Sequence, residues 1–197
     1  MAKTKQEMRQ QLRAARNLIE PPQRDSNAIN LCKTAIKLPY LITAQNIAFY
    51  WPIDDEINCL PLLNYCLQQG KKCFLPVLLV DLLQKLAFAS YTAETPLLKN
   101  RYGISEPELS FASLTRLLDL DIIFVPVVGF DKQGRRLGRG GGYYDATFAD
   151  LNKNPHAKWP KLVGLAYNCQ YIDEIPADSW DWQLDAVITE TDIHNFK

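Results

Sequence analysis

The stretch Val128-Gly-Phe-Asp-Lys-Gln-Gly-Arg-Arg-Leu-Gly-Arg-Gly-Gly-Gly-Tyr-Tyr-Asp145 decides how this chain is organised. It holds six of the nine glycines, which predicts backbone positions with positive φ or a close approach of the main chain to a ligand. Arg135, Arg136 and Arg139 lie among these glycines. Exposed N–H groups beside guanidinium groups suit phosphate oxygens. We therefore expect an anion-binding loop, and the alternative is a solvated surface turn.

The flanking segments favour the first interpretation. Residues 121–128 form an almost continuous apolar run, as expected for a central strand covered on both faces. After the loop, Tyr144, Phe148 and Leu151 recur at i, i+4 and i+7, which predicts a helix from 142 to about 152. A strand, a glycine loop and a helix N-terminus in this order favour a bound phosphate.

In the rest of the chain, predicted helices alternate with predicted strands. We expect further helices at 3–19, 25–37, 58–69 and 113–118, further strands at 47–53, 72–78, 86–91, 162–167 and 184–189, and irregular structure at 95–108. This order predicts an α/β fold, in which residues 1–197 form a single three-layer α/β/α domain. Its sheet is expected to be mostly parallel and Rossmann-like, with a small antiparallel excursion near 72–91.

Composition limits the possible partners. The 22 basic and 22 acidic residues cancel, which argues against a general nucleic-acid surface. The N-terminus lacks an apolar signal core, and the longest apolar run, near 74–80, is too short to span a bilayer. We expect a cytoplasmic monomer with neither nucleic acid nor membrane as a partner. The cysteines are odd in number and form no Cys-x-x-Cys pair, so buried free thiols are expected at Cys32, Cys59, Cys66, Cys73 and Cys169.

Two charged groups outside the loop are candidates for a site. Lys5, Arg9 and Arg16 fall along one edge of the first predicted helix, where they are either solvated or lean over a bound anion. Asp54 and Asp55 follow the strand at 47–53 and either cap the next helix or belong to a site. Because ligands bind beyond the carboxyl ends of strands in such sheets, the next residue, Glu56, is a candidate to hold a polar substrate group.

The known phosphate motifs are absent. No glycine precedes Lys-Ser or Lys-Thr, and Gly-x-Gly-x-x-Gly fails at Tyr143. The only histidines, His156 and His194, occur in polar contexts and are predicted to be surface residues. A chain poor in general bases but rich in arginine, glycine amides and carboxylates fits phosphoryl transfer. Asp145 is either a helix first-turn residue or a Mg²⁺ ligand, with Asp181 as a second carboxylate.

At this point the sequence resembles a known family. The motif Phe130-Asp131-x-x-Gly134-x-Arg136-Leu137-Gly138-x-Gly140-Gly141-Gly142-Tyr143-Tyr144-Asp145 is similar to the signature of the 5-formyltetrahydrofolate cyclo-ligases, also called methenyltetrahydrofolate synthetases. Further blocks follow in the family's order: Lys5-x-x-x-Arg9, Tyr50-x-Pro52-x-x-x-Glu56-Ile57, Glu106-Pro107, Gly164-Leu165-Ala166-Tyr167, Gln170, Ile175-Pro176 and Asp181-x-x-x-Asp185-x-Val187-x-Thr189-Glu190.

The resemblance implies an ATP- and Mg²⁺-dependent ring closure of 5-formyltetrahydrofolate, with or without a polyglutamate tail, to 5,10-methenyltetrahydrofolate, ADP and phosphate. A phosphorylated formyl group is the implied intermediate. The family pattern implies these roles: ATP binding by Lys5, Arg9, Arg136, Leu137, Gly138, Arg139, Gly140, Gly141, Gly142, Tyr143 and Tyr144; substrate binding by Trp51, Glu56 and Arg9; catalysis by Arg139 and Tyr144; Mg²⁺ ligation by Asp145 and Asp181.

Two positions depart from the family pattern. Trp180 precedes Asp181 where many relatives have histidine, and Trp51 replaces an aliphatic residue, so it either stacks on the pterin or crowds it. Two other functions remain open: a protein that binds folate or nucleotide without turnover, and an ATP-dependent enzyme of the same fold that acts on another formyl or amide group.

Overall fold

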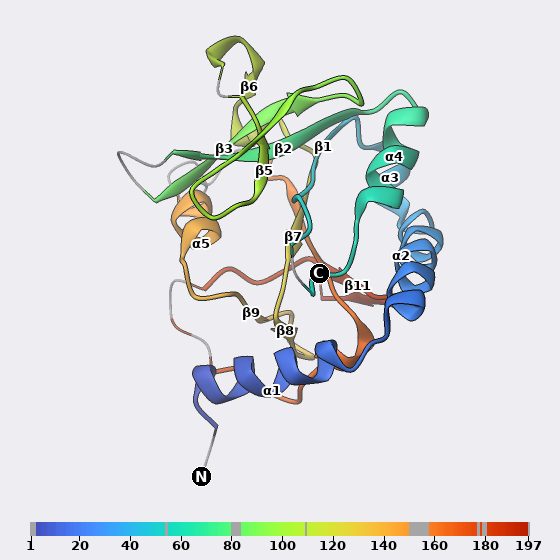
Figure 1. Cartoon of the computed structure of the whole chain (residues 1–197), viewed down its shortest axis with the longest axis vertical. Coiled ribbons are helices and arrows are strands. Elements are labelled where there is room, and N and C mark those ends of the chain that lie inside the picture. The colour runs from blue at the N-terminus through green and yellow to red at the C-terminus, as the bar shows by residue number, and fades with distance from the viewer. Residues whose placement is uncertain are drawn as a thin grey trace.

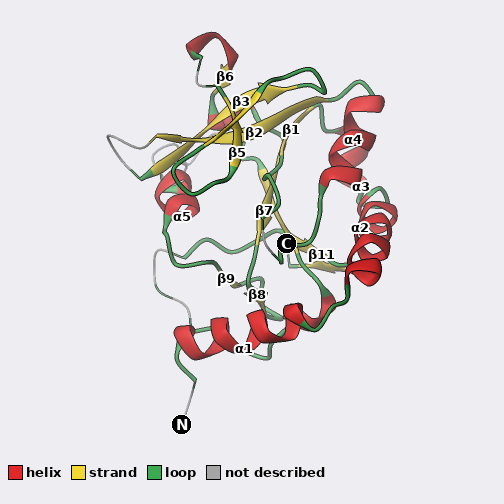
Figure 2. Cartoon of the chain, viewed as in Figure 1, coloured by secondary structure: helices red, strands yellow, loops and turns green. Residues whose placement is uncertain are grey.

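The computed structural model describes residues 3–53, 55–79, 84–108, 110–149, 158–176, 178 and 181–196. Its centre is an eight-stranded sheet with the strand order β12-β11-β10-β7-β1-β2-β3-β6 (Figures 1 and 2). The strands are β1 (Asn46–Ala48), β2 (Lys72–Leu79), β3 (Lys85–Tyr91), β6 (Leu114–Thr115), β7 (Ile122–Pro126), β10 (Lys161–Leu165), β11 (Ala186–Ile188) and β12 (Ile193–Asn195). The five central strands from β11 to β2 run parallel, and β3, β6 and β12 add antiparallel edges. The mostly parallel sheet and its antiparallel excursion at 72–91 are confirmed.

Helices cover both faces of this sheet. In Figure 1, α2 (Pro21–Ala35), α3 (Pro39–Thr43) and α4 (Leu60–Gln68) lie on one side, and α5 (Tyr143–Phe148) lies on the other. The strand β7 shows why two layers are needed: Ile122 and Phe124 join the core under α2 and α4, whereas Ile123 and Val125 join the core that contains Phe148 of α5. Alternate side chains of a strand point to opposite faces, so a strand that is apolar throughout must be covered twice. The predicted three-layer α/β/α architecture is therefore observed.

A third, smaller core fixes the first helix. The helix α1 (Lys5–Asn17) lies across the end of β7, beside the hairpin β8 (Gly129–Phe130) and β9 (Arg136–Leu137) (Figure 1). Leu12 of α1 packs with Val128, Leu137 and Ile175. Thr4 and Glu7 form a capping box that starts α1, with Thr4 Oγ1 accepting the Glu7 N–H at 3.2 Å. This packing brings the basic edge of α1 to the glycine-rich segment.

Several predicted elements differ from the structure. The helix predicted at 113–118 is replaced by η1 (Phe111–Ser113), β6 and η2 (Leu117–Asp119), and the segment predicted to be irregular contains the hairpin β4 (Leu97–Lys99) and β5 (Ser105–Pro107). Neither α3 nor β12 was predicted from the sequence. The first strand ends at Ala48 rather than 53, and α2 begins at Pro21 because proline is well suited to the first helical turn. The helix predicted from 142 to about 152 is α5, which ends at Phe148, and the predicted positions 150–152 lie outside the described residues.

The cysteine and histidine predictions were partly wrong. Cys59, Cys66 and Cys73 are buried free thiols, whereas Cys32 is half-buried and Cys169 is exposed. Burial raises the pKa of the Cys66 and Cys73 thiols to about 12. His194 is half-buried, with ring centroids 5.1 Å from Phe130 and 6.3 Å from Tyr171, so it is not a free surface residue. His156 lies outside the described residues. No helix within the described ranges is long and apolar enough to cross a membrane.

Candidate active site

One cavity of about 390 Å³ collects the predicted site residues beyond the carboxyl ends of the parallel strands. Pro126 at the end of β7 and Leu78 near the end of β2 belong to its wall. Every residue that the family resemblance implicated also lines it: Lys5, Arg9, Trp51, Glu56, Arg136, Leu137, Gly138, Arg139, Gly140, Gly141, Gly142, Tyr143, Tyr144, Asp145 and Asp181. The chain therefore brings its N-terminal helix, its glycine-rich segment and its late acidic segment to one place.

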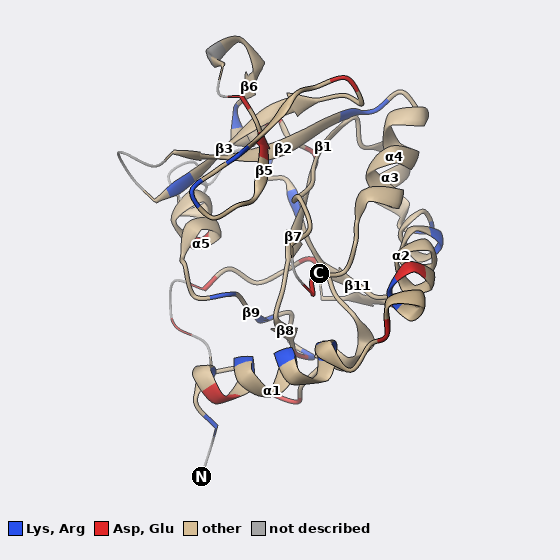
Figure 3. Ribbon diagram, viewed as in Figure 1, with Lys and Arg blue, Asp and Glu red and all other residues tan. Residues whose placement is uncertain are grey.

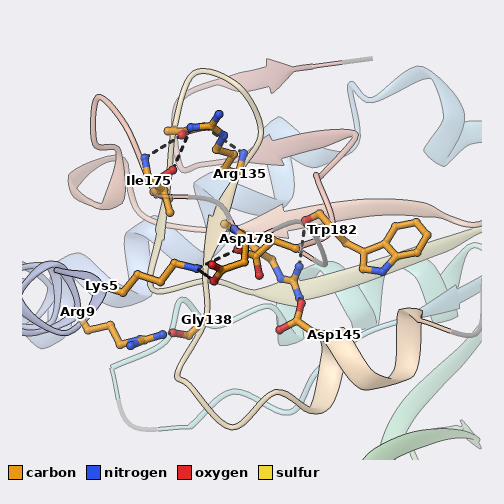
Figure 4. Close-up of polar contacts among 11 residues, drawn as sticks. Lys5, Arg9, Arg135, Gly138, Asp145, Ile175, Asp178 and Trp182 are labelled. Carbon is orange, nitrogen blue, oxygen red and sulfur yellow. Dashed lines mark hydrogen bonds and ion pairs between the residues drawn. The ribbon is translucent and has the colours of Figure 1, made fainter. Parts of the chain in front are cut away.

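Lys5 and Arg9, the first two residues of the basic edge of α1, line this cavity. Figure 3 marks the basic positions along α1 in blue. Lys5 Nζ donates to Asp178 at 2.7 Å and to Asp181 at 2.9 Å, and Arg9 Nε donates to the Gly138 carbonyl at 2.8 Å (Figure 4). Burial alone would lower the pKa of Lys5, but the two aspartates raise it above its ordinary value. They thus hold Lys5 in its charged form. Asp178 was not among the predicted site residues.

The third basic residue of this edge has a different environment. Arg16 is 1% exposed, and its Nη2 lies 2.8 Å from Asp55 Oδ2. The contact is an ion pair without hydrogen-bond geometry, because Arg16 Nη2 has no hydrogen-bond partner among the described residues. Burial lowers the pKa of Arg16, and Asp55 opposes that shift. Arg16 is therefore not part of a solvated edge, and Asp55 is not a helix cap. Their ion pair anchors the segment at 55–56 to α1, and Asp54 lies outside the described residues.

The three arginines of the glycine-rich stretch point to three different partners. Arg135 donates to the Ile175 carbonyl at 3.1 Å and lies 3.4 Å from Glu174, so it ties the hairpin to the segment at 172–176 (Figure 4). It does not line the cavity, so of the three arginines only Arg136 and Arg139 do. The buried carboxylate of Asp131 accepts the N–H groups of Gln133, Arg135 and Ile175 and so fixes the turn between β8 and β9.

Arg136 lines the cavity but is largely buried behind it, with a side chain 6% exposed. It pairs with the Asp145 carboxylate and donates to the Trp182 carbonyl at 3.1 Å (Figure 4 labels Asp145 and Trp182). Its guanidinium carbon also lies 5.7 Å from the centre of the Phe148 ring. Fixed by these contacts, Arg136 orients Asp145 towards the cavity.

Asp145 and Asp181 form the oxygen-rich corner of the site. Burial raises the pKa of Asp145; Arg136 opposes this shift and the charge of Asp181 adds to it, and both carboxylates line the same cavity. Burial also acts to raise the pKa of Asp181, but the Asp178 N–H and Lys5 bring it below its ordinary value. Two neighbouring carboxylates fit Mg²⁺, which takes one or two protein carboxylates and completes its shell with phosphate and water oxygens.

The segment between the hairpin and α5 is shaped by glycine. Gly140 has φ 102° and Gly142 has φ 70°, values that side-chain-bearing residues rarely adopt. Gly142 is the N-cap of α5 and contributes no side-chain cap. A Cβ at Gly140 would lie 3.7 Å from the Arg9 guanidinium carbon, so the loop runs close to the basic edge of α1.

Arg139, the third arginine, pairs with a residue predicted to hold the other substrate. Its Nε lies 2.9 Å from Glu56 Oε1, while Glu56 Oε2 accepts the Ile53 N–H at 3.2 Å. The Glu56 side chain is 6% exposed and that of Arg139 is 35% exposed. Burial raises the pKa of Glu56, and Arg139 partly offsets that effect. The predicted ATP and folate regions therefore meet at this ion pair.

The other side of the cavity is mostly apolar, and most of its residues were not predicted from the sequence. Trp51 packs edge-on against Tyr91, with ring centroids 6.3 Å apart. The hairpin of β4 and β5 contributes further lining residues, namely Asn100, Tyr102, Ile104 and Glu106. Tyr102 Oη lies 2.8 Å from Tyr143 Oη, which joins this hairpin to the start of α5. Glu106 and Pro107, which stood in the family motif, were the signal for the hairpin part of this wall.

Known proteins resemble this chain in both sequence and fold. A sequence model of the 5-formyltetrahydrofolate cyclo-ligase family matches residues 1–190. The 5-formyltetrahydrofolate cyclo-ligase of Haemophilus influenzae is 36% identical over 180 residues, covering 91% of this chain and 94% of the relative. That of Escherichia coli K12 is 32% identical over 182 residues, covering 92% and 98%. The NMR structure of Aquifex aeolicus 5,10-methenyltetrahydrofolate synthetase superposes with a TM-score of 0.80 at 29% identity, covering 98% of this chain and 93% of the other. The chain belongs to the 5-formyltetrahydrofolate cyclo-ligase family.

Proposed function

We propose that this protein catalyses the ATP- and Mg²⁺-dependent cyclisation of 5-formyltetrahydrofolate to 5,10-methenyltetrahydrofolate, with release of ADP and phosphate. One observation carries the proposal: in a chain of this family, a basic helix edge, a glycine-rich segment, two neighbouring carboxylates and a largely apolar wall all line one cavity. That inventory suits two substrates, one rich in phosphate and one with a flat heteroaromatic ring.

We assign the polar side of the cavity to ATP. Lys5, Arg9 and Arg139 supply the charge that phosphate oxygens require, and the backbone from Arg136 to Tyr144 supplies N–H groups. Arg136 and Leu137 contribute to this side mainly through their backbone. The Arg136 side chain is paired with Asp145, and the Leu137 side chain packs in the small core under α1. Asp145 and Asp181 would hold Mg²⁺, which neutralises phosphate charge when it is bound.

We assign the apolar side to the folate. The Glu56 carboxylate would accept hydrogen bonds from the pterin, whose ring edge offers adjacent N–H donors, and Trp51 would lie against the flat ring system. We also assign Arg9, which lines the same cavity, to contact with either substrate. The hairpin residues Tyr102 and Ile104 would pack beside the remainder of the folate.

The proposed reaction has two steps, transfer of the γ-phosphoryl group and then ring closure. The formyl oxygen attacks the γ-phosphorus of ATP, and ADP leaves. N10 then attacks the formyl carbon and loses its proton, the C–O bond breaks, and phosphate carries away the formyl oxygen. Arg139 would stabilise the phosphoryl group in transfer, and the Tyr144 hydroxyl would help to orient it. Burial raises the pKa of Tyr144 well above its ordinary value, so this hydroxyl stays a hydrogen-bond donor.

The proposal extends to domain organisation, oligomeric state, location and partners. Residues 1–197 would form a single domain, because one eight-stranded sheet contains both the first strand, β1, and the last, β12. We propose that it acts as a monomer in the cytoplasm on 5-formyltetrahydrofolate with or without a polyglutamate tail. The zero formal net charge supports the absence of a nucleic-acid partner, and no membrane is proposed as a partner.

The test is direct. Methenyltetrahydrofolate absorbance is followed after mixing protein, 5-formyltetrahydrofolate, ATP and Mg²⁺, with reactions lacking each component as controls. The proposal predicts a signal that needs all four and one ADP released per product. Tight folate binding without an ATP-dependent signal would indicate a binding protein instead. ADP release with another formyl or amide compound, but not with this folate, would indicate a different substrate.

A further inference from the structure

The Glu56–Arg139 ion pair gives the two proposed substrate regions a shared contact. Arg139 belongs to the glycine-rich segment assigned to ATP, and Glu56 follows the first strand on the side assigned to folate. Their atoms lie 2.9 Å apart. A substrate that engages one member of the pair must therefore change the surroundings of the other.

Glu56 cannot give up its partner without a replacement. Its side chain is 6% exposed, and burial already raises its pKa although Arg139 opposes the shift. A buried carboxylate that loses a donor pays a large desolvation penalty unless new donors take over. The adjacent N–H donors of a pterin edge can do this in a bidentate manner. Folate binding thus offers Glu56 a substitute for Arg139.

The rest of the site tolerates this exchange. Arg16 acts electrostatically on Glu56 as well as on its own partner Asp55, so a buried positive charge remains nearby when Arg139 turns away. Arg139 is 35% exposed and lines the cavity, so its side chain has room to turn from Glu56 towards the rest of the site. Its guanidinium, once released from Glu56, is suited to a phosphate oxygen in the same cavity.

We propose that folate and ATP bind cooperatively because the folate displaces Arg139 from Glu56 and so releases it to the ATP phosphates. This inference rests on the proposed function, since it assigns the two members of the pair to the two substrates. Glu56 is then a positioning residue for Arg139 in addition to a folate ligand. By thermodynamic linkage ATP must strengthen folate binding by the same factor by which folate strengthens ATP binding.

Calorimetry on the full-length protein tests the proposal. The dissociation constant of a non-hydrolysable ATP analogue with Mg²⁺ is measured with and without 5-formyltetrahydrofolate, and the reciprocal titration is run in parallel. We expect folate to tighten analogue binding about tenfold in the wild type, within the usual range of coupling between two ligands. In Glu56→Gln, which keeps the shape but not the charge, the tightening should fall below about twofold, at folate concentrations that saturate the variant. The analogue alone should bind Glu56→Gln at least as tightly as it binds the wild type.

Two further variants separate this exchange from a general loss of structure. Arg139→Gln should bind the analogue more weakly and show no coupling, and adding Glu56→Gln to it should change analogue binding no further. Glu106→Gln is the matched control: it neutralises another cavity carboxylate, whose partners are the Leu78 N–H and the Asn100 amide, and it should keep the coupling.

Retained coupling in Glu56→Gln or in Arg139→Gln would overturn the proposal, as would a wild type without coupling. The product assay keeps this result distinct from a failure of the proposed function. If the wild type forms methenyltetrahydrofolate but shows no coupling, only the proposed ion-pair exchange is contradicted. A wild type that forms no product sinks both.

Discussion

Lys5 Nζ and Asp181 Oδ2 lie 2.9 Å apart although 176 positions separate the two residues in the sequence. The contact joins the first turn of the first helix to the late acidic segment at the edge of the cavity. It forms because α1 packs against the hairpin of β8 and β9 through Leu12 and Leu137. A small apolar core thus places a cation beside the carboxylates proposed to bind metal.

Replacing Lys5 should weaken ATP binding more than it weakens folding. A charged hydrogen bond contributes about 1.5–3 kcal/mol, so Lys5→Gln should raise the dissociation constant of an ATP analogue roughly ten- to a hundredfold. Its ion pairs are partly exposed, so the free energy of unfolding should fall by about 1 kcal/mol or less. Lys3→Gln is the control, because Lys3 instead contacts the exposed Gln11 at 2.6 Å. Equal ATP affinities in the two variants would contradict the assignment of Lys5.

The buried pair of Arg136 and Asp145 should matter to stability as well as to activity. Arg136→Gln leaves a half-buried carboxylate without its countercharge, and breaking a buried pair in this way costs about 3–5 kcal/mol. We expect the lower end of this range in urea unfolding, because Asp145 keeps part of its exposure. Arg135→Gln, whose partner Glu174 is 76% exposed, should cost about 1 kcal/mol. If the two neighbouring variants lost the same stability, Arg136 would not be the buried anchor of Asp145.

These arginines also mark the limit of sequence reasoning. The glycine pattern and the apolar run before it predicted a loop after a central strand, because strand burial and glycine conformations depend on local sequence. Nothing local distinguishes Arg135, Arg136 and Arg139, yet one holds the hairpin, one is buried beside Asp145 and one meets Glu56. Their roles depend on which distant segment packs beside each.

The same limit applies to the apolar wall and to the edge of α1. The segment at 95–108 has weak periodicity, and its hairpin is held by long-range hydrogen bonds such as that from the Leu78 N–H to Glu106 at 3.2 Å. Arg16 follows the same helical edge as Lys5 and Arg9, but only the fold buries it against Asp55. Helical spacing places these residues on one edge and does not show how deep each one lies.

The position of α1 itself can be tested at Gly129. A Cβ built there would lie 2.5 Å from Leu12 Cδ1, so Gly129→Ala must push α1 or Leu12 away. We expect the free energy of unfolding to fall by about 1–3 kcal/mol and the KM for ATP to rise, because Lys5 and Arg9 move with the helix. The double variant Gly129→Ala with Leu12→Ala should lose less stability than the sum of the single variants. Strict additivity would show that the two residues do not meet.

Asp121 gives a prediction for the pH dependence of stability. Its Oδ2 accepts the N–H groups of Gln45 at 2.8 Å and Asn46 at 3.0 Å and so fixes the start of β1 beside β7. Burial opposes ionisation, but these two hydrogen bonds and Lys158 bring the pKa of Asp121 below its ordinary value of 3.8. The stabilisation is therefore fully present above pH 3.8 and is lost as the pH falls through the lower folded-state pKa.

Asp121→Ala should accordingly destabilise the protein by about 1.5–3 kcal/mol near neutral pH, where the carboxylate is charged. The stability difference from the wild type should shrink as the pH falls below the pKa of the Asp121 carboxyl in the folded state, since the wild type then loses the same contribution. Urea unfolding at neutral pH and at acidic pH measures both values. Asp119→Ala is the matched control: Asp119 pairs with the exposed Arg116, so its replacement should change stability much less at either pH. A difference for Asp121→Ala that stayed constant across the acid range would show that the lost contribution is packing and not the charged hydrogen bonds.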